Sequence, residues 1–356
     1  FLLGLKNIRN LSVPFSDKNV SVIVCVRNGA LSLSQLLNTL KNQVYKGKIE
    51  FLIVDDQSVD DSKKIILRFR EKDGRFKYIH SSQDNSDLNH KKKALNIGIR
   101  SASFKYLLFT DVDCTLSKGW VQSMMDNYNN NDYVIGYSEV RKQNTFVSHF
   151  QSIDFSMLML SCCSTTFSGY PLACSGQNQS YKKSLFLSVG GFDKIKNLLQ
   201  GDDTLFLQIC QKNKKNKVVF SINSDSFVYG KTINSLRDLI KQRVRWAGDA
   251  NIMWQYNKIF FIIILSTFIT NLFLIFLLID TLLFQKISLL FFLLIIIKVI
   301  LEFSLYYFGS KRLNRSISIN SFFLWFIFNP IYTVLVGFLS FFADKIKWRG
   351  RSSKTL

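Results

Sequence analysis

The chain has 356 residues, a formal charge of +21 at pH 7 and 47% hydrophobic residues. A chain of this length can bury a full-sized core as one large domain or two ordinary ones, without disulfide bonds. The basic charge gathers beside apolar stretches, at Lys311, Arg312, Arg315 and residues 345–354, as it does on cytoplasmic flanks that face anionic lipids. Because no nucleic-acid recognition motif accompanies this charge, we exclude nucleic acid as a partner.

Composition divides the chain into a globular part and an apolar part, which begins near Lys258. Three segments in the apolar part are each long enough to cross a bilayer, which takes about 20 residues. They are residues 259–279, 287–308 and 322–342. We therefore predict an integral membrane protein of the inner or plasma membrane, in contact with membrane lipids. Its predicted parts are a linker at 1–17 after a missing N-terminal membrane helix, a globular domain at 18–233, an amphipathic interfacial segment at 234–257, a membrane domain at 258–344 and a basic tail at 345–356.

Strand and helix patterns alternate through the first part of the globular domain. Residues 20–26 (VSVIVCV) form a β-branched apolar run, which is typical of a strand buried on both faces. A helix follows, whose leucines at positions 31, 33, 36, 37 and 40 fall largely on one face. Further strands are predicted at 51–54, 77–79 and 106–110, and helices at 61–70 and 91–100. This βαβ spacing predicts an α/β fold with a parallel sheet covered by helices on both faces.

The six cysteines all lie in the globular part, at positions 25, 114, 162, 163, 174 and 210. Their spacing matches neither a zinc site nor a small disulfide framework. We expect reduced and mostly buried thiols, which fit a cytosolic compartment for this domain.

Acidic residues follow two of the predicted strands, where ligands bind in sheets of this kind. Asp111 and Asp113 stand two positions apart after residues 106–110, so both carboxylates can approach one cation. Hard divalent ions such as Mg²⁺ prefer such oxygen ligands and share them with substrate phosphates. Asp55 and Asp56 follow an earlier strand. Acidic pairs also form turns and helix caps, but here we assign the cap to Ser58 or Asp60 and leave Asp55 and Asp56 free for a base or ribose.

Six motifs in a fixed order carry a resemblance to a known family. They are VDDQS, KKKALNIGI, FTDVDC, GQNQSYKK, GGFD followed by GDDTLF, and QRVRW. Together they resemble glycosyltransferase family 2, in the membrane-bound branch that carries QxxRW, and the resemblance covers residues 20–246. It implies a Rossmann-like GT-A catalytic domain followed by C-terminal transmembrane helices. GQNQSYKK and Leu116 depart from the family pattern, which puts acceptor contacts of Gln177 and Asn178 in doubt.

The resemblance also implies roles for the donor side of the site. Asp55 and Asp56 would contact the uridine of a nucleotide-sugar. Asp111 and above all Asp113 would hold Mg²⁺ or Mn²⁺ against the diphosphate, and Lys91 or Lys92 would stabilise the leaving diphosphate. The alternative for these lysines is an exposed basic helix start.

On the acceptor side, the resemblance implies that Asp203 is the catalytic base. The alternative is that Asp202 and Asp203 only cap the following helix, with Asp202 the better candidate for that role. From QRVRW, Gln242 would bind the nucleotide-sugar, Arg245 its phosphate oxygens, and Trp246 would be a platform for the acceptor. Interfacial anchoring is the alternative for Arg245 and Trp246.

These roles predict an inverting, metal-dependent transferase that moves a hexose or N-acetylhexosamine from a nucleotide-sugar, such as a UDP-sugar, to a lipid-linked or glycolipid acceptor. The catalytic domain would face the cytoplasm. A processive polysaccharide synthase is one alternative. A non-catalytic, nucleotide-binding membrane scaffold is another, in which Lys298 and Glu302 of the second apolar segment could form a pathway pair. We favour their pairing with each other.

Three full spans would bring the basic tail to the outside, against the positive-inside rule. We therefore expect that residues 322–342 do not cross, because Asn329 and Pro330 at their centre can break the segment into a re-entrant pair. The C-terminus would then be cytoplasmic.

Overall fold

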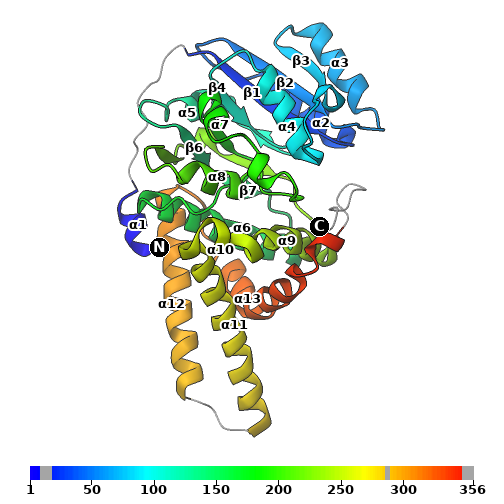
Figure 1. Cartoon of the computed structure of the whole chain (residues 1–356). Helices are drawn as coiled ribbons and strands as arrows, with labels where there is room; N and C mark the ends of the chain where they lie inside the picture. Colours follow the sequence, from blue (N-terminus) through cyan, green and yellow to red (C-terminus); the bar gives the residue numbers. More distant parts are fainter. Residues whose placement is uncertain (9–17, 285–288, 347–356) are drawn as a thin grey trace.

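The computed structural model describes residues 1–8, 18–284 and 289–346, and its globular part is built on a seven-stranded sheet (Figure 1). The strands are β1 (Val20–Val26), β2 (Ile49–Asp55), β3 (Phe76–His80), β4 (Tyr106–Phe109), β6 (Tyr133–Gly136), β8 (Gln179–Lys182) and β9 (Val218–Ser221). Their order across the sheet is β3-β2-β1-β4-β8-β6-β9. The four strands predicted from the sequence form one half of this sheet.

The sheet is mixed, because β8 runs antiparallel to both of its neighbours, β4 and β6. All other pairs are parallel. The prediction of a parallel sheet was therefore wrong at β8, since the short segment QSYK carries no pattern that reveals strand direction. The reversal pairs Gln179 with Phe109, so the residues just before β8 lie beside the carboxyl end of β4.

The strands and helices predicted in the first part of the domain are present, with bounds that differ by at most two residues. The helices are α2 (Ala30–Lys41), α3 (Ser62–Lys72) and α4 (His90–Ser101). The buried face of α2 is narrower than predicted, because Leu31 in its first turn is 98% exposed. The leucines that it buries are Leu33, Leu36, Leu37 and Leu40.

Alternate residues of the central strands face two separate cores. Val22 and Val24 of β1 belong to a core with α2, α3 and α5 (Trp120–Met125). Ile23 belongs to the opposite core, with α4, α6 (Phe146–Phe167), α7 (Lys183–Ser188) and α8 (Thr204–Gln211). Helices on both faces of the sheet are thus confirmed. A second, three-stranded sheet of β5 (Thr115–Leu116), β10 (Val228–Gly230) and β7 (Ser138–Val140) lies at the side of the domain.

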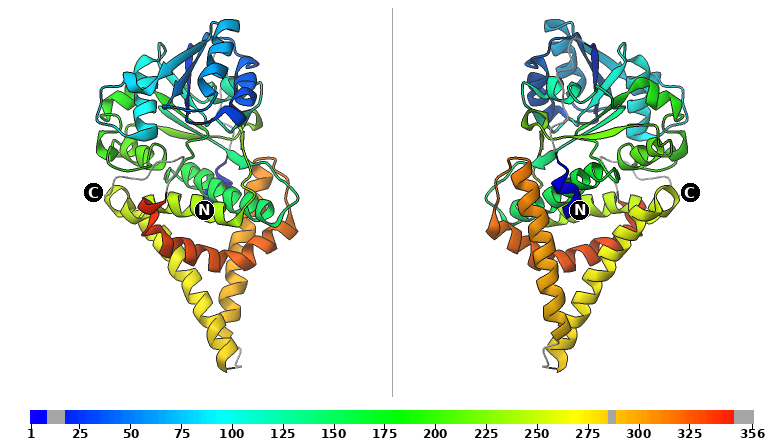
Figure 2. Two further views of the ribbon diagram at one scale, coloured as in Figure 1. Left: turned by 90° about the vertical axis from the view of Figure 1, so that its right-hand side faces the viewer. Right: turned by 90° about the vertical axis from the view of Figure 1, so that its left-hand side faces the viewer.

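Helices close the base of the globular domain. α6 and α9 (Leu236–Ala247) lie below the main sheet, followed by the short α10 (Met253–Tyr256) (Figures 1 and 2). At the start of the chain α1 (Leu2–Lys6) packs against α6 and α12. The interpretation of residues 1–17 as a linker after a missing membrane helix is not tested, and residues 9–17 lie outside the described part of the chain.

Among the described residues, three helices are long and apolar enough to cross a membrane: α11 (Lys258–Phe284), α12 (Leu289–Arg312) and α13 (Ile319–Ser340). α11 and α12 project away from the globular domain, whereas α13 runs across its base, below α6 and α9 (Figure 2). It packs against α6, α9 and α11. The expectation that the third segment does not cross stays a prediction.

The expected re-entrant break is wrong, because α13 is one continuous helix with Pro330 inside it. Proline removes one backbone hydrogen bond. Packing on three other helices, and side-chain bonds along the helix, keep the two halves together. A break would be needed only for a segment that must turn back within the bilayer.

Two further expectations are confirmed. Lys298 Nζ lies 2.7 Å from Glu302 Oε2, so the charges of α12 pair with each other. All six cysteines are free, and Cys25 alone among them is more than slightly exposed.

Candidate active site

The site is assembled at the carboxyl ends of β1, β2 and β4. The loops after β1 and β2 bind each other: Arg27 Nη1 donates to the Asp56 carbonyl at 2.8 Å, and the Asn28 amide donates to Ser58 Oγ at 3.0 Å. Asn28 and Gln57 have positive φ values of 48° and 58°. Backbone in this region is uncommon for residues other than glycine and persists where surrounding contacts hold it, often at ligand sites.

Asp55 and Asp56 are both buried, with 2% and 4% of their surface exposed. Asp55 accepts hydrogen bonds from the Ser58 amide at 2.9 Å and from Tyr78 Oη at 3.1 Å. Burial and the Asp55 charge raise the pKa of Tyr78 to about 12. Asp55 is therefore not the free acceptor that we expected, because it also forms the turn after β2.

The neighbouring contacts fix the second carboxylate and the start of α3. Asp56 Oδ1 accepts a hydrogen bond from Ser81 Oγ at 3.1 Å. Asp60, one of our two candidates for a cap, accepts from the Ser62 amide in the first turn of α3 at 3.0 Å. A carboxylate has about four acceptor positions, so Asp55 and Asp56 can each still bind a ligand.

Lys91 joins two acidic motifs that are far apart in the sequence. Its Nζ lies 3.0 Å from Asp111 Oδ1, after β4, and 3.0 Å from Asp202 Oδ2, before α8. Burial opposes the charge on Lys91, but Asp111 and Asp202 raise its pKa well above the ordinary value. The lysine is therefore a charged member of the site and not part of an exposed basic helix start.

Lys92 has a different environment, although it is the next residue. It is 1% exposed, and its Nζ donates to the carbonyls of Leu198 and, at 3.0 Å, Gln200. Burial lowers the pKa of Lys92 to about 8. Its contacts hold the loop that leads to Asp202 and Asp203, so of the two lysines that we considered for the diphosphate, only Lys91 reaches the acidic cluster.

Asp203 is the N-cap of α8, where its side chain accepts from the Thr204 amide. The amide of Gly176, just before β8, donates to Asp203 Oδ2 at 3.0 Å. Asp202 instead pairs with Lys91, so our preference for Asp202 as the cap was wrong. Burial and the adjacent Asp202 charge raise the pKa of Asp203 to about 6. It is the more basic carboxylate of the two.

Arg245 of α9 approaches the same cluster from below. Its Nη1 donates to Gln200 Oε1 at 2.6 Å, and Gln200 Nε2 donates back to the Arg245 carbonyl. Burial lowers the pKa of Arg245, against the charges of Asp202 and Asp111. Two cations, Lys91 and Arg245, thus surround the acidic residues.

Comparison with known proteins identifies the family. Residues 21–186 match "Glycosyl transferase family 2", and residues 108–340, well over half of the chain, match "Glycosyl transferase family group 2". The chain belongs to glycosyl transferase family group 2. This confirms the resemblance predicted from the motifs and makes the protein a family 2 glycosyltransferase.

Curated relatives and a solved structure agree with this family and fold. The chain is 24% identical over 237 residues to poly-β-1,6-N-acetyl-D-glucosamine synthases of Staphylococcus epidermidis and Staphylococcus aureus (strain COL), which covers 65% of the chain and 54% of each relative. It therefore spans about half the length of these relatives. Mannosyltransferase PcManGT from Pyrobaculum calidifontis, solved with GDP-Man and Mn²⁺, shares the fold at 17% identity and a TM-score of 0.51, over 69% of this chain and 66% of that one. The GT-A fold is thus confirmed.

In this family 2 glycosyltransferase, the remaining QRVRW residues cluster around a residue that we did not predict. Arg243 Nη1 donates to Gln242 Oε1 at 2.6 Å, and the Arg243 guanidinium lies 4.3 Å from the centre of the Trp246 ring. Trp246 also packs on Phe155 of α6, with ring centres 5.8 Å apart. The QxxRW motif defines only Gln242, Arg245 and Trp246. Because Arg243 stands at one of the two undefined positions, the motif could not predict that it is buried beside Asp154.

Asp249, just after the motif, was also missed. Desolvation and the charges of Asp203 and Asp202 raise the pKa of Asp249 to about 8. No motif marks this position. Conversely, Asn178 is fully buried and donates to the carbonyls of Tyr137 and Ser226, so the doubt about its contact with the acceptor is justified.

The metal-binding prediction rests on Asp111 and Asp113, which both lie in the turn after β4 that the bond from the Cys114 amide to the Asp111 carbonyl closes. Within the described residues, no three His, Cys, Asp or Glu side chains are grouped closely enough to form a metal cage by themselves. A hard cation that keeps water and takes substrate phosphate needs only one or two carboxylates. The partly exposed Asp111 side chain and the neighbouring Asp113 fit such an ion.

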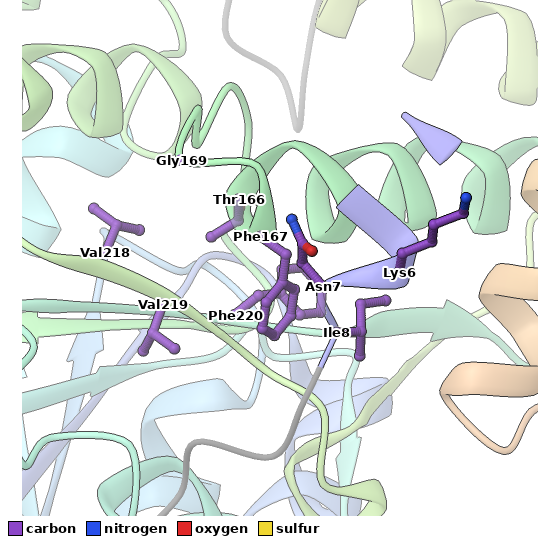
Figure 3. A pocket seen from close by; sticks show the side chains of 9 residues that line it. All are labelled: Lys6, Asn7, Ile8, Thr166, Phe167, Gly169, Val218, Val219 and Phe220. Atoms are coloured by element: carbon purple, nitrogen blue, oxygen red, sulfur yellow. The ribbon is translucent and has the colours of Figure 1, made fainter. Parts of the chain in front are cut away.

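A separate cavity of about 510 Å³ contains none of these residues. It lies between the end of α1, the last turn of α6 and the edge strand β9 (Figure 3). Lys6 is its one charged residue, and Val218, Val219 and Phe220 form one wall. Its lining lacks the carboxylates that sugar transfer needs.

Proposed function

We propose that this glycosyltransferase is inverting and metal-dependent, and that it moves a hexose or N-acetylhexosamine from a UDP-sugar to a lipid-linked or other glycan acceptor at the membrane surface. The observation that carries the proposal is the junction made by Lys91. One lysine contacts both Asp111 of the metal motif and Asp202, whose neighbour Asp203 is the candidate base. Donor and acceptor chemistry can therefore meet in one cluster.

On the donor side, Asp55 and Asp56 would bind the nucleoside. Their buried carboxylates are already oriented by Tyr78 and Ser81. Asp111 and Asp113 would hold Mg²⁺ or Mn²⁺, which when bound supplies positive charge against the diphosphate. Lys91 and Arg245 are fixed cations in the same cluster, and pre-oriented charges of this kind stabilise a leaving group without reorganisation during the reaction.

On the acceptor side, Asp203 would act as the general base. The acceptor hydroxyl loses its proton to the Asp203 carboxylate while its oxygen forms a bond to the anomeric carbon. The bond from that carbon to the diphosphate oxygen breaks, and the nucleoside diphosphate leaves with the electron pair. One such displacement inverts the anomeric configuration. The raised pKa of Asp203, at about 6, suits a base that works near neutral pH.

The acceptor is proposed to be presented at the membrane surface. Trp246 and Gln242 lie on α9, the helix that separates the acidic cluster from α13 and the apolar helices. An aromatic ring in this position offers a flat surface for a sugar ring. Basic residues Lys311 and Arg315, at the catalytic end of α12, support a cytoplasmic catalytic domain.

A processive polysaccharide synthase is the second candidate, because the relatives named above are synthases of a β-1,6-linked polymer. Secretion of a polymer requires a polar path between several helices. In the described part of the chain two long helices, α11 and α12, project together, which favours transfer to an acceptor carried by lipid. A non-catalytic scaffold is not proposed, since the family and the complete cluster both indicate an enzyme.

The test uses the purified full chain with UDP-N-acetylglucosamine, UDP-glucose and GDP-mannose, each with Mn²⁺. Release of free nucleoside diphosphate is measured with membrane lipid extract as acceptor source, and products are sized by mass spectrometry. We expect release from a UDP-sugar, its loss in excess chelator, and addition of a single sugar. Long chains of product would favour the synthase, and no release from any donor would contradict the proposal.

A further inference from the structure

Arg243 is buried where three helices meet. It is 5% exposed, and its Nε donates to Asp154 Oδ2 of α6 at 2.8 Å. Tyr332 Oη of α13 donates to the same Asp154 oxygen at 3.4 Å. Because Arg243 belongs to α9, a single carboxylate connects α9, α6 and α13. These three helices lie together at the base of the globular domain (Figure 2).

The same guanidinium holds two residues of the QxxRW motif. Arg243 Nη1 donates to Gln242 Oε1 at 2.6 Å, and the guanidinium plane lies over the Trp246 ring at 4.3 Å. Phe155, next to Asp154 in the sequence, packs close to both groups, with its ring centre 5.7 Å from the Arg243 guanidinium and 5.8 Å from the Trp246 ring centre. Side-chain rotation of Gln242 and Trp246 is thus restricted by Arg243.

The side chains of Arg245 and Arg243 point in different directions from α9, although both residues belong to the QRVRW motif. Two residues along a helix differ by about 200° in direction, so the two side chains leave opposite sides of α9. Arg245 bonds Gln200, beside the acidic cluster, whereas Arg243 faces Asp154. The positive charge beside Asp111, Asp202 and Asp203 therefore comes from Lys91 and Arg245 and not from Arg243.

The connection to α13 is not confined to Tyr332. His149 Nδ1 of α6 lies 2.9 Å from Ser321 Oγ, and Ser340 Oγ of α13 donates to Asn251 Oδ1 at 3.3 Å. The polar side chains of α13 therefore face the catalytic domain at its start, middle and end. Exposed side chains along α13 form an apolar row: Ile319, Phe323, Ile327, Ile331, Leu335 and Leu339.

We propose that Arg243 is a positioning residue. Through its hydrogen bond to Asp154, which also binds Tyr332, it fixes the side chains of Gln242 and Trp246 relative to α13. The Trp246 ring, which is our candidate contact for the acceptor, is thereby held at a fixed distance from the membrane-facing helices. This inference rests on the proposed function, in which Trp246 contacts the acceptor. It assigns a role to a motif position that carries no defined residue. Arg243 itself touches neither donor nor acceptor.

Fold stability alone does not account for the arrangement. A buried ion pair costs desolvation, and well-packed apolar residues of similar size are often as stabilising. What apolar residues cannot supply is a planar group that hydrogen-bonds Gln242 and Asp154 while it stacks on Trp246. The arginine is thus suited to orientation.

The experiment compares Arg243→Gln and Arg243→Lys with a matched control, Arg315→Gln. Arg315 also forms a partly buried pair between the helical base and the catalytic domain, with Nε 3.1 Å from Glu139 Oε2 of β7, but it lies away from QxxRW. All variants are made in the full chain. The first readout is hydrogen exchange of the peptide that covers α9, and the second is calorimetric binding of UDP with Mn²⁺.

The third readout separates transfer from donor use. Initial rates are measured, with the UDP-sugar that the wild type uses, for hydrolysis by water and for transfer to the acceptor in the membrane lipid extract. For Arg243→Gln, and not for the control, we expect faster hydrogen exchange in α9 than in the wild type. The rate of donor hydrolysis should be unchanged, and the UDP affinity should stay within about twofold of the wild type. The transfer efficiency should fall by about 10- to 100-fold through a higher KM for the acceptor, because small misplacements of a substrate have effects of this size. Arg243→Lys keeps the charge and is expected to lie between.

Unchanged exchange in α9, equal effects of Arg315→Gln, or a parallel loss of UDP affinity would overturn the positioning role. A wild-type chain that releases no UDP from any donor would instead contradict the proposed function. The exchange data would still decide the positioning role in that case, because they do not depend on turnover.

Discussion

Asp203 is the cap of α8 and our candidate for the general base, two roles that the sequence presents as alternatives. Its carboxylate caps α8 through the Thr204 amide and accepts from the Gly176 amide, yet these two bonds use only part of its acceptor capacity. The backbone donors also fix its direction. A cap and a general base are therefore compatible in one residue, and the structure gives no reason to choose between them.

Asp203→Asn is expected to lower transfer by about 10²- to 10⁴-fold, because an amide cannot accept the hydroxyl proton. UDP binding with Mn²⁺, measured by calorimetry, should be unchanged. In the wild type the base works only when deprotonated, so kcat/KM should rise with pH through about 6, the pKa of Asp203, and then level. The residual kcat/KM of Asp203→Asn should not show this rise with pH. A large loss of UDP affinity would point to a nucleotide-binding role.

Asp113→Asn tests the metal more cleanly than a change at Asp111, because Asp111 also pairs with Lys91. We expect loss of turnover with a native circular dichroism spectrum and melting temperature, since the variant removes a ligand to the cation and leaves the Lys91 pair intact. Excess chelator should have the same effect on the wild type. Full wild-type turnover in chelator would contradict metal dependence.

The sequence predicted that acidic and basic residues gather at the strand ends, but not which of two adjacent residues makes which contact. Adjacent residues on a helix point about 100° apart, so a run such as HKKK does not reveal that Lys91 faces the acidic cluster and Lys92 the loop carbonyls. The same holds for Asp202 and Asp203, which differ by a single peptide bond. Such choices depend on the tertiary position of Leu198 and Gly176, far away in the sequence.

At the scale of elements, periodicity recovered half of the main sheet. β1 to β4 and their helices alternate regularly, and their apolar runs are long enough to be recognised. β8 is four residues long and contains Gln, Ser and Lys, so neither its existence nor its antiparallel direction could be predicted. Its burial comes from stacking of Tyr181 on Phe109, at 4.5 Å, a contact with no local signature.

Close packing of α4 on the sheet sets the position of Lys91. A Cβ atom at Gly98 would lie 2.8 Å from Ile23 Cγ2 and 3.0 Å from Val54 Cγ2, and β-branched side chains in strands cannot move away easily. Gly98→Ala should therefore destabilise the protein by about 1 kcal/mol, since overpacking of about 1–3 kcal/mol exceeds the gain in helix propensity. Thermal unfolding of the purified chain measures this difference.

Gly74→Ala is the matched control for that measurement, because no heavy atom lies within 4 Å of the added Cβ position. Its melting temperature should equal that of the wild type or exceed it slightly. If Gly98→Ala unfolds at or above the control temperature, α4 is not held by close packing against β1 and β2.

At the scale of the whole molecule, the helical base resolves a conflict in the distribution of charge. We expect α11 and α12 to be the two helices that cross the membrane. After α12 the chain lies beside the globular domain again, where Arg315 pairs with Glu139. α13 then runs along the base, and its end stays beside α9, where Ala343 lies 2.8 Å from a Cβ position at Gly248. The basic residues beyond 346 lie outside the described part of the chain.

The last prediction is that the C-terminus is cytoplasmic. In a variant without the six native cysteines, Ser353→Cys should resist an impermeant thiol reagent in intact cells and react after permeabilisation. Gln285→Cys, between α11 and α12, is the matched control and should react in intact cells, because a hairpin of two spans exposes its turn on the far side. Three full spans would reverse the result for Ser353→Cys and leave that for Gln285→Cys unchanged. Rapid labelling at both positions would therefore show that α13 crosses the membrane, against its crosswise packing on α6 and α9.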